Sequence, residues 1–181
     1  MEAVTLDKHR SCHAITMRWF SLLLFTGLVA STLHAQARCP GNASAIPFHM
    51  NQRQMLVSVM INQSGPYDFV LDTGTQMTVV DQALATDLHL AKTGDVNVAG
   101  MSLQGGAMFA QVASLAVGEH VSKNLSVLVY DMKSLHAAGF AIRGLLGEDF
   151  LSKFDVLIDN AHNVLCLDDT GAMRSDITQG N

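Results

Sequence analysis

Short apolar runs separated by turn-forming residues dominate the chain from about residue 46 to residue 168. Runs rich in valine, isoleucine and leucine, bounded by glycine, asparagine or proline, are typical of β-strands. Strands are expected at 54–61, 67–71, 78–80, 95–98, 107–117, 121–130, 155–159 and 163–167. The pattern therefore predicts an all-β fold, a small closed barrel-like lobe with one or two short helices.

Helical spacing is confined to short segments. Asp81 is an expected N-cap for a helix through residues 83–90, and residues 148–154 fit a second helix. Residues 132–138 are expected to form a loop or a short helix. The polar residues 169–181 are expected to be a loose C-terminal tail.

The N-terminal residues have the features of an export signal. Lys8, Arg10 and Arg18 precede an apolar run at 19–30, and Ala35-Gln36-Ala37 offers small residues for a signal peptidase. Residues 1–37 are therefore expected to be a signal peptide, and a start at Met17 would leave 1–16 as an extra leader. An uncleaved anchor is the alternative, although the apolar run is short for a bilayer of about 30 Å.

This signal predicts a periplasmic or secreted protein that meets a membrane only if the N-terminal segment is retained. Residues 38–45 would then be an N-terminal segment before the domain at 46–168. In an oxidising compartment, Cys39 and Cys166 could form a disulfide within one chain or between two subunits. A buried free Cys166 is the alternative, so the cysteine state stays open.

Composition excludes several classes of function. Hydrophobic residues make up 49% of the 181 residues and charged residues 15%, which favours a packed core over disorder. The formal net charge is −5 and no basic cluster is present, so nucleic acid is not an expected partner. The histidines form no zinc motif and no glycine-rich phosphate loop occurs, so no metal or cofactor is expected.

The candidate chemistry lies at Asp72-Thr73-Gly74-Thr75, directly after the apolar strand at 67–71. A carboxylate carried on a buried strand is costly unless it has a partner or a purpose. The triplet Asp-Thr-Gly is not by itself evidence of a catalytic site, because it occurs again at Asp169-Thr170-Gly171. That second triplet lies in a polar context and is interpreted as a C-terminal turn.

Four markers in a fixed order resemble the retropepsin-like aspartic proteases, in particular their exported bacterial members. Residues 69–75 resemble the active-site strand and loop, and Gly105-Gly106 is similar to the mobile flap. Leu145-Leu146-Gly147 resembles the apolar-apolar-glycine element with its following helix, and residues 154–159 are similar to the closing strand.

The resemblance implies an aspartic endopeptidase that hydrolyses peptide or protein substrates as a homodimer, with water activated between two Asp72 carboxylates. Thr73 would reach across the subunit interface, and Gly74 would present its backbone to the substrate. Thr75 would donate a hydrogen bond to Asp72 and favour an acidic pH optimum. Gly105 and Gly106 would belong to a flap over the cleft, or else to an ordinary hairpin turn.

Other assignments stay open. A peptide-binding module that has the fold without turnover is the alternative function. Asp149 is expected to be a structural acid at a helix end, and Gln76 and Glu148 stand where relatives often have an acid and a base that pair. The following residues are candidate pocket walls, or else simply core: Met101, Leu103, Met108, Leu145 and Leu146.

Overall fold

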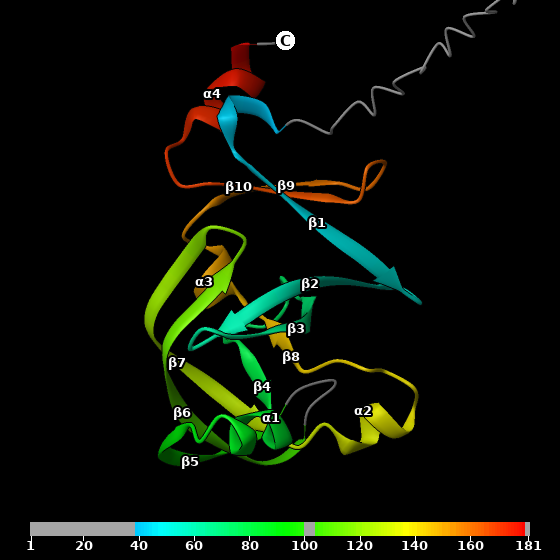
Figure 1. Ribbon diagram of the computed structural model, residues 1–181, viewed down its shortest axis with the longest axis vertical. Coiled ribbons are helices and arrows are strands. Elements are labelled where there is room, and N and C mark those ends of the chain that lie inside the picture. Colours follow the sequence, from blue (N-terminus) through cyan, green and yellow to red (C-terminus); the bar gives the residue numbers. More distant parts are fainter. Residues whose placement is uncertain (1–38, 100–103, 180–181) are drawn as a thin grey trace, which may run out of the picture. The chain divides into compact units, whose positions relative to one another are not determined.

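A computed structural model describes residues 39–99 and 104–179, and β-strands dominate them (Figure 1). The expected signal peptide lies outside the described residues. The strands are β1 (Ser44–Asn51), β2 (Gln54–Ile61), β3 (Ser64–Leu71), β4 (Val79–Asp81), β5 (Ala91–Ala99), β6 (Gln104–Val117), β7 (His120–Tyr130), β8 (Gly144–Leu146), β9 (Asp155–Asp159) and β10 (Val164–Asp168). The helices are the 3-10 helix η1 (Pro40–Asn42) and α1 (Gln82–Asp87), α2 (Lys133–Ala137), α3 (Glu148–Leu151) and α4 (Ala172–Gln179). None of these described helices is long and apolar enough to cross a membrane.

Strand pairing closes a ring. The order of neighbouring strands is β5-β6-β7-β4-β8-β3-β2-β1-β10-β9, and β2 pairs additionally with β6. That extra antiparallel pairing, with Ile61 opposite Leu115, joins β2, β3, β8, β4, β7 and β6 into the ring. The expected all-β barrel-like lobe is thereby confirmed, although the described residues contain four short α-helices rather than one or two.

The ring strands bury side chains on both faces. In β3, Phe69 and Leu71 belong to one buried cluster and Val70 belongs to another. β4, on the other side of β8 from β3, divides in the same way, with Val80 in the first cluster and Val79 in the second. Because successive side chains of a strand point to opposite faces, the two clusters lie on opposite sides of the sheet. The second cluster is covered by residues of the α2 connection, including Met132 and Ile142.

The two ends of the domain differ from expectation. The pattern does not predict β1, because Pro47 stands between its two buried residues, Ile46 and Phe48. The first half of β1 pairs with β10 and the second half with β2. The expected loose tail is wrong for residues 172–179, which form α4 and bury Met173 at 2% exposure.

A disulfide fastens the start of the domain to its last strand. Cys39 is bonded to Cys166 of β10 with a Cα–Cα distance of 5.6 Å, which resolves the open question in favour of a bridge within one chain. Beside it, the Gly41 N–H donates to Asp176 Oδ2 of α4 over 2.8 Å. A Cβ at Gly41 would lie 2.4 Å from the Met173 backbone nitrogen, so only glycine fits between η1 and α4.

Candidate active site

Asp72 stands half-buried at the end of β3. Its backbone N–H donates to the Leu146 carbonyl over 3.1 Å, which continues the parallel pairing of β3 with β8 by one residue. Its carboxylate oxygen Oδ1 accepts a 2.9 Å bond from the Gly74 N–H. Strand alternation places the Asp72 side chain on the face of Val70, the face of the second cluster.

The loop after Asp72 is held against the junction of β8 and α3. The backbone N–H groups of Glu148 and Asp149 donate to the carbonyls of Thr75 and Gln76 over 2.9 and 3.0 Å. At Gly147 the approach is so close that an added Cβ would lie 2.6 Å from the Met77 carbonyl carbon. The apolar-apolar-glycine element therefore supports the Asp72 loop through close backbone contact.

The Asp149 side chain at the start of α3 connects this element to Thr78, just after the Asp72 loop. Its carboxylate accepts the Thr78 hydroxyl over 2.7 Å and the Thr78 N–H over 3.0 Å. The same hydroxyl oxygen accepts the Gly147 N–H over 3.2 Å, and Thr78 is fully buried. The expectation that Asp149 is structural, at the start of a helix, is confirmed. The sequence did not point to Thr78, because its partner lies 71 positions away.

The Thr75 hydroxyl, one residue after the triplet, has a different partner from the expected one. Thr75 Oγ1 donates to the Met77 carbonyl over 3.3 Å, so the expected hydrogen bond from Thr75 to Asp72 is wrong for the single subunit. The Gly74 backbone N–H takes that role instead, because the tight turn brings it back onto the carboxylate. Thr73 is exposed, and its contact with a second subunit stays a prediction.

The expected flap glycines lie in a long hairpin. Gly105 and Gly106 belong to β6 and pair with Val98 and Asn97 of β5. A Cβ added to Gly106 would meet nothing within 4 Å. Residues 100–103, and with them Met101 and Leu103, lie outside the described residues.

The remaining candidate pocket walls divide between the two faces. Leu146 is fully buried in the first cluster and is a core residue. Met108 is half-buried against that cluster and lines a pocket with Leu90 and Lys92. Leu145 is half-buried against the second cluster, on the face to which Asp72 belongs. Leu145 is therefore the one of these three that lies on the same face of the sheet as Asp72.

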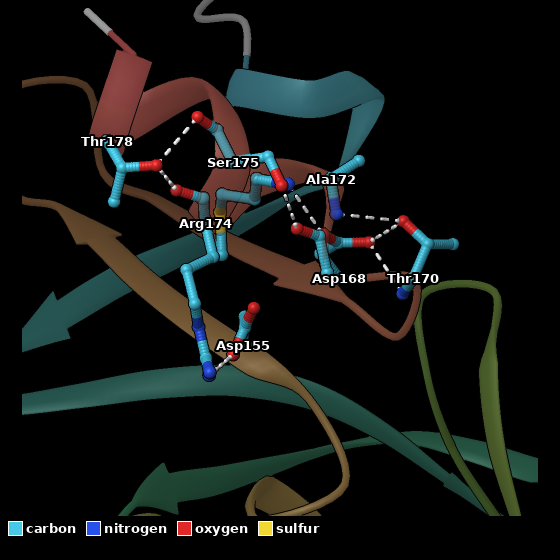
Figure 2. Close-up of polar contacts among 9 residues, drawn as sticks. Asp155, Asp168, Thr170, Ala172, Arg174, Ser175 and Thr178 are labelled. Carbon is cyan, nitrogen blue, oxygen red and sulfur yellow. Dashed lines mark hydrogen bonds and ion pairs between the residues drawn. The ribbon is translucent and has the colours of Figure 1, made fainter.

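The second triplet has a structural role through the residue before it. Figure 2 shows the Asp168 carboxylate between Thr170 and the start of α4. Asp168 Oδ1 accepts the Thr170 hydroxyl over 2.6 Å, and Oδ2 accepts the Met173 N–H over 2.7 Å. Asp169 itself is exposed. The interpretation of Asp169-Thr170-Gly171 as a C-terminal turn is confirmed, and the turn starts the helix that the sequence did not predict.

These hydrogen bonds make the stability of the α4 end depend on pH. The Thr170 hydroxyl, followed by the Met173 and Thr170 N–H groups, lowers the pKa of Asp168. A lowered folded-state pKa stabilises the fold above the unfolded-state value, and the contribution is lost as pH falls through the folded-state value. Asp168→Asn should therefore lower Tm at pH 7, with a deficit that shrinks from about pH 4 downward. Thermal melts across pH, with the exposed Asp169→Asn as the matched control, test this; a constant deficit would contradict it.

Sequence comparison supports one family. Residues 57–150, more than half of the chain, match the family profile described as aspartyl protease. No curated protein matches the chain significantly. In the described residues, no group of three or more His, Cys, Asp or Glu side chains could hold a metal ion.

Solved structures give weaker similarity. A retropepsin-like aspartic protease from Rickettsia conorii is 21% identical over 69% of this chain and 90% of its own, with a TM-score of 0.49. EIAV protease complexed with the inhibitor HBY-793 is 21% identical over 57% of this chain and 90% of its own, with a TM-score of 0.45. The retroviral protease-like domain of Ddi1 from Leishmania major is 16% identical over 64% and 92%, with a TM-score of 0.43. At these scores the structures add no argument of their own.

Proposed function

Because the chain belongs to the aspartyl protease family, we propose that it is an aspartic endopeptidase that works as a homodimer. The observation that carries the proposal is the setting of Asp72. Its backbone is fixed by Leu146, its carboxylate is oriented by the Gly74 N–H, and it is half-buried rather than free in solvent. The exposed Asp169 of the second triplet has no such setting.

The chemistry requires two carboxylates. Two such groups about 3 Å apart cannot both ionise, so the pair shares one proton. The ionised member removes a proton from the bound water, which attacks the peptide carbonyl while the protonated member polarises the carbonyl oxygen. The titration of such a pair belongs to both groups together. An acidic pH optimum stays a prediction, and activity that rises steadily above pH 8 would contradict it.

A second copy of the chain is the proposed source of the second carboxylate. A residue beside a twofold axis meets its own copy, so one Asp72 per subunit is sufficient. Thr73 is exposed and therefore free to contact the partner loop. Gln76 and Glu148 are exposed as well but do not form an acid–base pair, so the dimer must be stabilised by other contacts.

The proposed substrate is an extended peptide in an exported compartment. The β5–β6 hairpin is the proposed flap, and a peptide beneath it would be held by main-chain hydrogen bonds with side chains in alternating pockets. The intramolecular disulfide supports an oxidising location, periplasmic or extracellular. No cofactor is invoked.

Dimer formation predicts that activity depends on enzyme concentration. The rate per subunit should rise with concentration and reach a plateau, because dissociated subunits contain half a site. Initial rates on a denatured protein substrate, measured alongside sedimentation of the same samples, test this. A rate per subunit that stays constant well below the dissociation constant would contradict the shared site. Peptide binding without turnover at any concentration would favour the alternative, a binding module.

A further inference from the structure

A charged cluster with one buried acid lies at the start of β8, the strand whose Leu146 carbonyl accepts the Asp72 N–H. Asp81, the last residue of β4, is 2% exposed although it is a carboxylate. Its Oδ2 lies 3.7 Å from Nε of Arg143, whose Nη2 lies 3.6 Å from Asp87 Oδ2 at the end of α1. We call Asp81, Arg143 and Asp87 the charged cluster. An acid so deeply buried is costly unless a cation is near it, and Arg143 provides that cation.

The backbone of Arg143 ties the charged cluster to β8. Arg143 directly precedes β8; its N–H donates to the Asp68 carbonyl of β3 over 2.8 Å, and its carbonyl accepts the Asp81 N–H over 2.9 Å. Three residues later, the Leu146 carbonyl of the same strand accepts the Asp72 N–H. The short strand β8 is thus held at its start by the charged cluster and at its end by the Asp72 loop.

The contacts of the cluster are incompletely satisfied. Asp81 Oδ1 accepts a long 3.4 Å bond from the Met132 N–H. Among the described residues, neither Asp81 Oδ2 nor Arg143 Nε has a hydrogen-bond partner, although both atoms are buried. The electrostatic attraction between the two groups is therefore the main interaction of these atoms, and its loss would leave a buried charge without a counterion.

We propose that Asp81 and Arg143 are positioning residues for Asp72: the ion pair between their side chains sets the place of β8 and, through Leu146, the place of the catalytic carboxylate. Neither side chain is required to touch substrate. The inference rests on the proposed function for its kinetic consequence, while its structural consequence, a fixed bond between Asp72 and Leu146, can be measured without catalysis.

The test compares Arg143→Met with Arg143→Lys, which keeps the cation, and with Asp87→Ala, which removes only the exposed acid (73% exposed side chain). Arg143→Met should lower kcat by about a hundredfold, as expected for a misplaced reacting group, with KM changed by less than about threefold. Arg143→Lys should recover most of the loss and Asp87→Ala should resemble wild type. Should Arg143→Met fail to fold, Asp81→Asn takes its place. Its kcat should then be lower than the kcat of Arg143→Lys and of Asp87→Ala, and equal kcat values in the three variants would contradict the positioning role.

Hydrogen exchange provides the readout that does not depend on activity. In Arg143→Met, the Asp72 amide should exchange faster, while the Leu165 amide, in the β9–β10 pairing away from the cluster, should not. If Arg143→Met has a lowered Tm but the kcat and the Asp72 amide exchange rate of wild type, the proposal is overturned and the pair has a purely stabilising role. If the wild-type protein cleaves nothing, the proposed function fails, and the exchange rates still decide the positioning role.

Discussion

Asp72→Asn should reduce kcat on a peptide substrate by about 10²–10⁴-fold, the range that general acid–base catalysis contributes. The amide has nearly the size and shape of the carboxylate but cannot accept the proton of the water. In a homodimer, the substitution removes both catalytic carboxylates at once. The fold should remain, because the backbone bond from Asp72 to Leu146 does not involve the side chain. Initial rates with matched protein concentrations and circular dichroism spectra measure both effects.

The chain offers a matched control for this variant. Asp169→Asn changes the same residue within the same three letters, but at an exposed turn. It should cleave at the wild-type rate. Equal residual cleavage by Asp72→Asn and wild type would reject the catalytic assignment. Peptide binding retained by Asp72→Asn would show that the peptide-binding surface remains intact when turnover is lost.

Removing the disulfide should cost about 2–5 kcal/mol in the free energy of unfolding. Cys39 and Cys166 are 127 positions apart, and in the chain-entropy account a cross-link over so long a loop stabilises by about 5 kcal/mol. The native bridge also holds η1 beside α4, where Gly41 and Asp176 are hydrogen-bonded. Urea denaturation of the Cys39→Ala/Cys166→Ala double variant, at a fixed protein concentration, measures the loss.

Reduction gives an independent control. Dithiothreitol should lower the urea midpoint of the wild-type protein toward that of the double variant and leave the double variant unchanged. A double variant within about 0.5 kcal/mol of wild type, the usual range for surface substitutions, would contradict this role of the bridge. Dimers on a non-reducing gel that disappear with reductant would point instead to a bridge between subunits.

The local features of this fold could be predicted from the sequence because they are encoded within a few residues. The strand at 67–71 and its acidic loop form one continuous pattern, as does Leu145-Leu146-Gly147 with the helix after it. Their contact could be expected only through resemblance to a family. The structure shows what holds that contact and what it requires: backbone hydrogen bonds from Glu148 and Asp149 join the two segments, and a side chain at Gly147 would collide with Met77.

Features that depend on distant partners could not be predicted in the same way. No local signal links Thr78 to Asp149 or Asp81 to Arg143, since each partner lies more than 60 positions away along the chain. The pairing of Cys39 with Cys166 stayed open because sequence spacing alone does not determine Cα separation. α4 was missed although Asp168 precedes it, because the apolar content of 172–179 is low and only Met173 is buried.

The central claim is that each working site needs one Asp72 from each of two subunits, and mixing wild-type protein with Asp72→Asn tests it most directly. After subunit exchange at constant total concentration, only dimers with two wild-type subunits should cleave, so activity should follow the square of the wild-type fraction. An equal mixture should therefore show about one quarter of the wild-type rate. A decline in simple proportion to the wild-type fraction, to about one half, would show that each subunit works alone and would contradict the account.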